Sequence, residues 1–103
     1  MNKQEQNHNK LPKVSIIILN YNGKKYLKDC FESLEEINYP KKRYEVIMAD
    51  NTSTDGSVEY VRKNFPWVKI LEFNKNCGFA VGNNKSAEIT IGKYIIFLNP
   101  DTV

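Results

Sequence analysis

The chain has 103 residues, of which 41% are hydrophobic and 26% are charged. This length allows one domain, and this composition predicts a folded core rather than intrinsic disorder. The net charge of +3 includes lysines of the first 13 residues, so the remaining body is too weakly basic to indicate a nucleic-acid or anionic-membrane surface.

The first 13 residues are expected to form a polar, flexible leader, followed by one domain over residues 14–103. The leader has no apolar segment typical of a signal peptide, and no stretch of the chain reaches the ~20 apolar residues of a membrane span. The single histidine, His8, lies in this leader. Catalysis by histidine is therefore not expected.

The two cysteines, Cys30 and Cys77, lie far apart and outside any metal-ligand spacing. We expect both to be reduced and buried, as is typical of a cytosolic protein.

Four apolar segments predict β-strands, over residues 14–20, 44–50, 67–73 and 93–99. The first two are apolar on both faces, which favours central parallel strands that are covered on both sides. The third alternates between apolar and polar residues and is typical of a strand nearer an edge.

Helices are predicted between these strands. Apolar residues at helical spacing predict a first helix over 24–37, and a second that ends near residues 64–66. Ser53 or Thr54 is expected to cap the second helix, with Asp55 near its positive end. A third, short helix is predicted over 79–89.

The alternation of strands and helices predicts an α/β fold, in three α/β/α layers around a mostly parallel sheet. Such sheets bind ligands beyond the carboxyl ends of their strands, at the switch point of the strand order. Because the last strand lies at the end of the sequence, we also expect an unpaired sheet edge that favours self-association.

Polar residues follow each predicted strand. Asn and Gly in such places are ordinary turn formers. However, two buried strands are followed or ended by carboxylates with no obvious local partner, Asp50 and Asp101. A hard cation that bridges phosphates needs one or two carboxylates. A base or ribose needs hydrogen-bonding groups beside a flat surface, which an Asp or Asn next to Tyr21 could provide.

Five segments, taken in order, resemble the inverting family 2 glycosyltransferases of the GT-A fold, and most closely the branch described as rhamnosyltransferase-like. They are "VSIIILNYNG", "LKDCFESL", "YEVIMADNTSTDGS", "NCGFAVGNN" and "YIIFLNPDT". The resemblance covers residues 14–102. It implies a truncated GT-A fold, which is a Rossmann-like nucleotide-diphospho-sugar transferase fold, and a donor site for a nucleotide-diphosphate sugar.

The resemblance implies six nucleotide-binding residues. The first two flank the base, the next two contact the base and the ribose, and the last two add a polar contact from the third helix. In this order, they are Leu19, Tyr21, Asp50, Asn51, Asn83 and Asn84.

The resemblance also implies a divalent metal, Mg²⁺ or Mn²⁺, at the Asp-x-Asp motif. That motif is Asn99-Pro100-Asp101 here, so Asp101 is its only charged ligand and Asn99 a weaker one. Asn51 and Asn83 also stand where the family often has an acid and an arginine. Fewer charges suggest a weaker metal site and a base such as thymine rather than uracil.

The implied reaction transfers a sugar from a dTDP- or UDP-sugar to a hydroxyl of a saccharide or lipid-linked acceptor, in polysaccharide biosynthesis. The implied location is the cytoplasm, with peripheral attachment to the inner membrane face left open. Family members are longer, and their acceptor site and general base follow the metal motif. We therefore expect no catalytic base in this chain.

Three alternative functions belong to other classes of protein. A truncated nucleotide-binding or self-associating module would lack turnover. A dinucleotide-binding Rossmann unit needs a Gly-rich turn after the first strand, where this chain has Gly23 alone. A phospho-receiver domain needs paired acids there, and Asn20-Tyr21-Asn22 provides none.

Overall fold

The computed structural model describes residues 12–75 and 79–100. Its sheet is parallel throughout, with the strand order β3-β2-β1-β4. The strands are β1 (Val14–Asn20), β2 (Tyr44–Asp50), β3 (Lys69–Glu72) and β4 (Tyr94–Leu98). All four lie within the predicted segments, and the alternation in sequence correctly predicted a parallel sheet.

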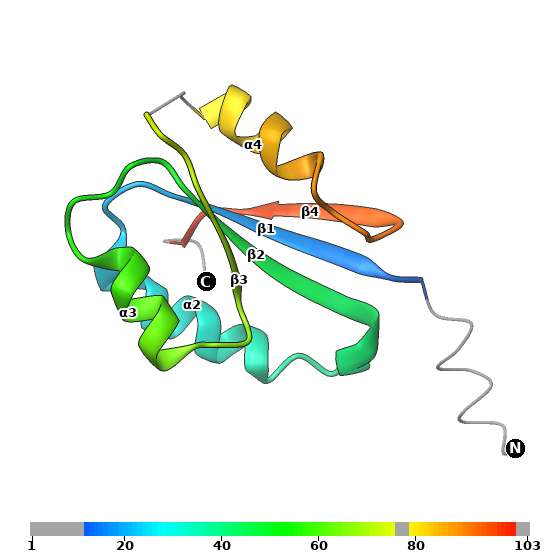
Figure 1. Cartoon of the computed structure of the whole chain (residues 1–103). Coiled ribbons are helices and arrows are strands. Elements are labelled where there is room, and N and C mark those ends of the chain that lie inside the picture. Colours follow the sequence, from blue (N-terminus) through cyan, green and yellow to red (C-terminus); the bar gives the residue numbers. More distant parts are fainter. Residues whose placement is uncertain (1–11, 76–78, 101–103) are drawn as a thin grey trace, which may run out of the picture.

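Helices cover both faces of the sheet. They are α2 (Lys24–Glu35), α3 (Ser57–Asn64) and α4 (Phe79–Ala87), with a short 3₁₀ helix η1 (Lys41–Arg43) before β2. Figure 1 shows α2 and α3 on one face and α4 on the other. The predicted three-layer α/β/α arrangement is therefore confirmed.

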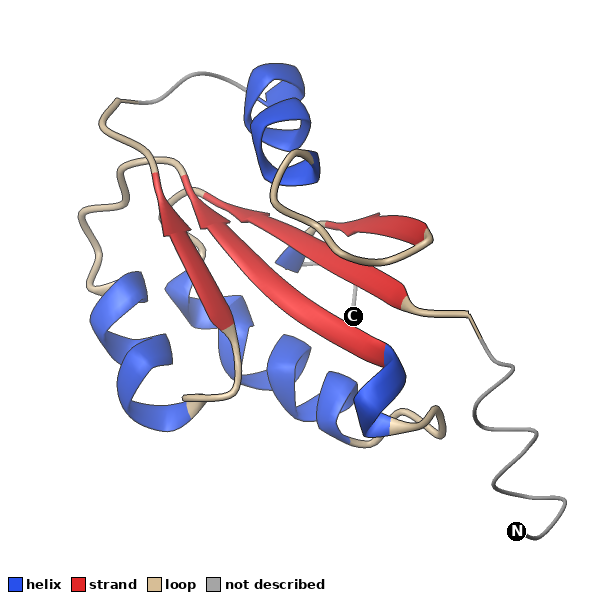
Figure 2. Cartoon of the chain, turned by 45° about the vertical axis from the view of Figure 1, so that its right-hand side comes forward, coloured by secondary structure: helices blue, strands red, loops and turns tan. Residues whose placement is uncertain are grey.

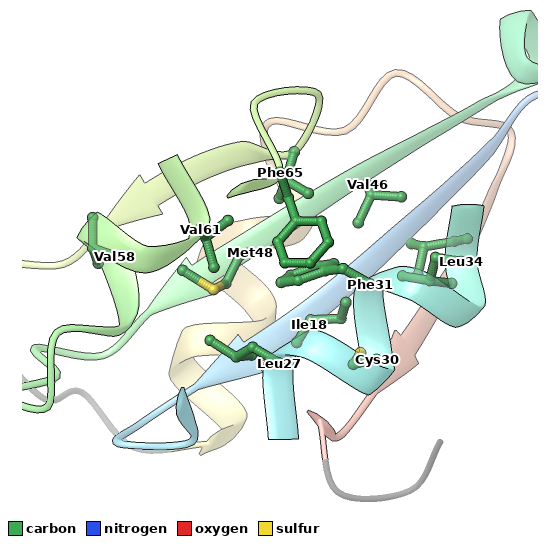
Figure 3. Close-up of a cluster of buried hydrophobic side chains, with 12 residues drawn as sticks. Ile18, Leu27, Cys30, Phe31, Leu34, Val46, Met48, Val58, Val61 and Phe65 are labelled. Atoms are coloured by element: carbon green, nitrogen blue, oxygen red, sulfur yellow. The ribbon is translucent and has the colours of Figure 1, made fainter. Parts of the chain in front are cut away.

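The main core lies between the sheet and the α2–α3 face. Side chains of a strand point alternately to its two faces, so Ile16 and Ile18 of β1 meet this core while Ile17 faces the other side. Phe31 of α2 is fully buried at its centre, with its ring 5.3 Å from that of Phe65 (Figure 3). This packing holds β1 and β2 rigidly under α2 and α3.

Several element boundaries differ from the predictions. β3 begins at Lys69 rather than at residue 67, because Trp67 packs edge-on against the rings of Phe31 and Phe65 instead of extending the strand. The helices α2 and α4 end two residues earlier than predicted. The capping prediction is wrong, because Gly56 occupies the N-cap of α3 and no side chain caps it there.

Strand β4 is an exposed edge of the sheet as described (Figure 2). Four consecutive large apolar side chains of this strand are 38–53% exposed, namely Tyr94, Ile95, Ile96 and Phe97. Neighbouring positions point to opposite faces, so both faces of the strand are partly uncovered. The apolar run predicted the strand correctly but not this exposure.

Cys30 is buried and not in a disulfide, as predicted, and burial raises the pKa of its thiol to about 11. Cys77 lies outside the described residues. Within residues 12–75 and 79–100, no helix has the length and apolar character needed to cross a bilayer.

Candidate functional site

The carboxyl ends of β1, β2 and β4 meet at one edge of the sheet. Asn20 and Asp50 are direct neighbours in the β1–β2 register, and β4 runs on the other side of β1. The strand order turns back at β1, so the crevice between the ends of β1 and β4 is the switch point.

A pocket of about 260 Å³ lies at this switch point. Residues after β1 form one side and residues after β4 form the other. Its lining consists of Asn20, Tyr21, Asn22, Gly23, Tyr26, Asn99 and Pro100. Tyr21, which is 56% exposed, and Asn99 thus belong to one concave surface.

Asp50 has local partners, contrary to the expectation from sequence. Its carboxylate is only 2% exposed and accepts hydrogen bonds from Asn20 Nδ2 (2.9 Å), Ser53 Oγ (2.7 Å) and the Ser53 backbone N–H (2.9 Å). Such bonds hold the side chain in one orientation and satisfy its buried charge. Asp50 is therefore a structural acceptor at the base of the site.

Ser53 connects the two loops at this edge, a role that sequence analysis missed. Its hydroxyl accepts a hydrogen bond of 2.9 Å from the Asn22 backbone N–H. Asn22 in turn accepts one of 2.7 Å from the Thr54 backbone N–H through Oδ1. The Asn-rich and Ser/Thr-rich turns are visible in the sequence, but their pairing across 31 and 32 residues is not.

Asp55 joins the starts of two helices. It accepts hydrogen bonds from the Lys24 backbone N–H of α2 (3.0 Å) and the Ser57 backbone N–H of α3 (3.0 Å). Burial by itself raises the pKa of Asp55, but the bonds from Ser57 and Lys24 outweigh it and hold that pKa below its ordinary value. The charge is thus stabilised where two helix N-termini meet.

Two residues of the proposed nucleotide set are buried. Leu19 lies beneath α4, where a Cβ added to Gly82 would stand 2.9 Å from Leu19 Cδ1. Asn51 is buried as well, and its backbone N–H donates to the Asn20 carbonyl at 2.9 Å. Glycine at position 82 therefore allows α4 to approach the end of β1 closely.

The remaining predicted site residues are less completely described. Asn84 is exposed on α4, and Asn83 belongs to the same helix but its side chain lies outside the described part of the structure. Asp101 also lies outside the described residues. Those that are described contain no cluster of three or more His, Cys, Asp or Glu side chains that could hold a metal ion. Of the predicted metal motif, Asn99 and Pro100 lie within the described residues.

A second concave surface, of about 490 Å³, lies beside the first and is rich in lysine. Lys24, Lys25 and Lys28 line it together with Asn22, Asp55 and Tyr60. Lys28 is paired with Glu32 at 2.7 Å, and Lys24 lies 5.7 Å from the centre of the Tyr60 ring. In the sequence, the lysines of the "NGKKYLK" segment indicate this basic surface.

Comparison with known proteins decides the family. The model of the family described as Glycosyl transferase family 2 matches residues 15–103. This chain belongs to glycosyl transferase family 2. This match confirms the resemblance to family 2, whereas the rhamnosyltransferase-like branch and the inverting mechanism stay predictions.

Relatives of this family 2 chain have similar sequences. It is 36% identical over 96 residues to the uncharacterized glycosyltransferase YibD of Escherichia coli, covering 90% of this chain and 27% of that protein. It is 33% identical over 93 residues to a poly(ribitol-phosphate) beta-glucosyltransferase of Bacillus spizizenii, covering 86% of this chain and 15% of that protein.

Solved structures agree with the fold. The mannosyltransferase PcManGT of Pyrobaculum calidifontis, in complex with GDP-Man and Mn²⁺, has a TM-score of 0.84 at 24% identity, over 91% of this chain and 29% of that one. Residues 1–349 of S. aureus TarS, in complex with UDP-GlcNAc, have a TM-score of 0.79 at 29% identity, over 86% of this chain and 26% of that one. The family 2 chain thus spans less than a third of each protein compared here.

Proposed function

We propose that this chain supplies the donor-nucleotide half of an inverting family 2 glycosyltransferase. The supporting observation is the pocket at the β1–β4 switch point, where Tyr21 and Asn99 line one surface together with Asn20, which donates a hydrogen bond to the buried Asp50. The donor is a nucleotide-diphosphate sugar and the acceptor a hydroxyl of a saccharide or lipid-linked molecule. This reaction belongs in the cytoplasm, where nucleotide sugars are made.

The nucleoside is bound mainly by Tyr21 and by the loops beside it. An exposed tyrosine ring offers a flat surface for the base, and its hydroxyl adds a hydrogen-bonding group. Asp50 and Asn51 fix the loop backbone beneath the ribose, Leu19 supports the pocket from under α4, and Asn83 and Asn84 add polar contacts. The proposed donors are dTDP- and UDP-sugars; among the similar solved structures, S. aureus TarS holds UDP-GlcNAc and PcManGT holds GDP-Man.

Asp101, with Asn99 as a neutral second ligand, is the proposed holder of Mg²⁺ or Mn²⁺. Carboxylate and amide oxygens suit these hard cations. A cation bound there would offset negative charge on the departing diphosphate. The lysines of the neighbouring basic surface would add positive charge on the same side. The general base that deprotonates the acceptor hydroxyl is proposed to lie outside this chain.

The test is calorimetric titration of the full 103-residue chain with UDP and with dTDP, each with and without Mn²⁺. Asp101→Asn keeps the side-chain volume but removes the charge, so we expect it to abolish the Mn²⁺-dependent gain in affinity. The matched control is Asp29→Asn, which removes the same charge from the exposed surface of α2. Equal Mn²⁺ dependence in both variants would refute the metal role of Asp101.

A second candidate function is a nucleotide-binding module that self-associates and does not turn over. The observation that favours it is the exposed apolar edge of β4. Unpaired edges of this kind bind other strands. Phe97→Lys should then reduce the mass measured by light scattering, whereas Val81→Lys, at a similarly exposed site on α4, should not. A wild-type chain that remains a monomer would rule out self-association.

A further inference from the structure

A second pocket lies at the end of the sheet opposite the proposed donor site. It has a volume of about 600 Å³, within the ~300–1,000 Å³ typical of small-molecule sites. Its lining includes Tyr44 at the start of β2 and Lys69 at the start of β3. Since β1 has seven residues, the two sites are separated by roughly 20 Å along the strands.

The walls of this pocket are largely apolar. They are formed by Val46 of β2, the ring of Tyr44, Ile91 of the loop before β4, and Trp67. Trp67 is 40% exposed, and its position is fixed by a hydrogen bond of 3.2 Å from Nε1 to Glu35 Oε1. A rigid, partly exposed indole is a favourable surface for an apolar or aromatic group.

The charged groups of the pocket are lysines Lys13, Lys41, Lys42 and Lys69 and glutamates Glu35 and Glu45. Lys69 pairs with Glu45 at 2.7 Å, and Glu45 also accepts hydrogen bonds from Ser15 Oγ and the Ile91 backbone N–H. Lys41 donates to the Tyr44 hydroxyl and to the Glu35 backbone carbonyl.

Lys13 and Lys42 differ from the other two lysines. Neither has an ion pair or a side-chain hydrogen bond with any residue in the described ranges 12–75 and 79–100. Lys13 is moreover only partly exposed. Two unpaired ammonium groups beside an apolar wall favour a ligand that carries both negative charge and apolar surface.

We propose that this pocket is a second ligand site, which binds a phosphate group attached to an apolar or aromatic moiety. The phosphate contacts Lys13 and Lys42, and the apolar part lies against Trp67, Val46 and Ile91. The phosphate can belong to a lipid headgroup or to a free phosphorylated metabolite. The site needs no nucleotide and no metal, so it stands or falls separately from the proposed donor site.

Trp67 provides the measurement, because it is the single tryptophan of the chain. The full chain is titrated with phenyl phosphate, with a short-chain phosphatidic acid below its micelle concentration, and with inorganic phosphate. We expect saturable changes in Trp67 fluorescence and in its indole N–H resonance with one or both of the first two. Phosphatidic acid alone would indicate a lipid source, and phenyl phosphate alone a free metabolite.

Variants identify the phosphate contacts. Lys42→Gln and Lys13→Gln should each weaken binding by about tenfold, the effect of losing one charge-assisted hydrogen bond. Lys63→Gln removes the same charge from the exposed surface of α3 and should leave the affinity unchanged. The proposal is overturned if neither organic phosphate perturbs Trp67, if inorganic phosphate binds as tightly as the organic ones, or if Lys63→Gln weakens binding as much as the two pocket variants.

Discussion

Asn20 at the end of β1 donates a hydrogen bond of 2.9 Å from Nδ2 to Oδ1 of Asp50, its direct neighbour at the end of β2. The Asn20 Oδ1 atom accepts a further bond of 3.1 Å from the Gly23 backbone N–H. A Cβ at position 23 would lie 2.6 Å from that oxygen, which explains the glycine. One buried amide thus holds the β1 loop against the carboxylate below the proposed donor site.

Replacing this amide tests how far the site depends on it. Asn20→Ala removes a donor from the buried Asp50 carboxylate and the acceptor of the Gly23 N–H. We expect the free energy of unfolding to fall by about 1–3 kcal/mol, as for other buried polar groups left without a partner. Urea unfolding measures this, with Asn38→Ala on an exposed loop as the control. Equal losses in both variants would show that the Asn20 network does not stabilise the fold.

Thr52 adopts a left-handed backbone conformation, with φ of 63°, in the loop after Asp50. This conformation is unfavourable for a β-branched residue and favourable for glycine. Thr52→Gly should therefore raise the free energy of unfolding by up to about 1 kcal/mol. The control, Thr54→Gly in the same loop, should lower it, because Thr54 is not in that conformation. Destabilisation by Thr52→Gly would contradict the strain argument.

Glu45 should make stability depend on pH. It is 8% exposed, and burial alone would raise its pKa. Bonds from the Ile91 N–H, Lys69 and Ser15 outweigh this effect and hold the folded-state pKa below the ordinary value of 4.5. A lowered folded-state pKa means that the stabilisation is complete above pH 4.5 and is lost as the pH falls through the folded-state pKa.

Thermal unfolding measured from pH 7 downward tests this prediction. The wild-type melting temperature should fall below about pH 4.5. Glu45→Gln should melt lower at pH 7, and its further fall in acid should be smaller than that of the wild type. Glu59→Gln, on the exposed surface of α3, should retain the wild-type profile. Parallel profiles for Glu45→Gln and the wild type would show that Glu45 is not responsible.

The strands and the layer order were predictable because a continuous β-branched run favours a buried strand, and apolar residues at helical spacing favour an amphipathic helix. Strands β1 and β2 lie within the predicted buried apolar segments. Strand β3 lies within the segment whose alternating pattern predicted a strand nearer an edge. The boundaries at Trp67 and Gly56 depend on tertiary contacts instead. Aromatic packing on Phe31 removes Trp67 from the strand, and Gly56, in a left-handed conformation, occupies the N-cap of α3 in place of Ser53 or Thr54.

The composition of the candidate site was only partly predictable. Sequence placed Tyr21, Asp50 and Asn99 at the carboxyl ends of strands, which follows from parallel pairing. The sequence could not show that Ser53 donates hydrogen bonds to the Asp50 carboxylate, because these bonds depend on the conformation of the loop after β2. Nor could it reveal the pocket at the amino ends, whose four lysines come from three separate segments. The exposure of the β4 side chains could not be predicted either, because an apolar run by itself predicts burial.

The central claim, that Tyr21 belongs to a donor-nucleotide site, is tested most directly by calorimetric titration of UDP and dTDP in the presence of Mn²⁺. The variants are Tyr21→Ala and its matched control Tyr94→Ala, since the two tyrosines are similarly exposed but lie at opposite ends of the sheet. We predict that the wild type and Tyr94→Ala bind with equal affinity, while Tyr21→Ala binds about tenfold more weakly, the loss of one stacking contact. Equal affinity of all three proteins, or no binding by the wild type, would contradict the proposed site.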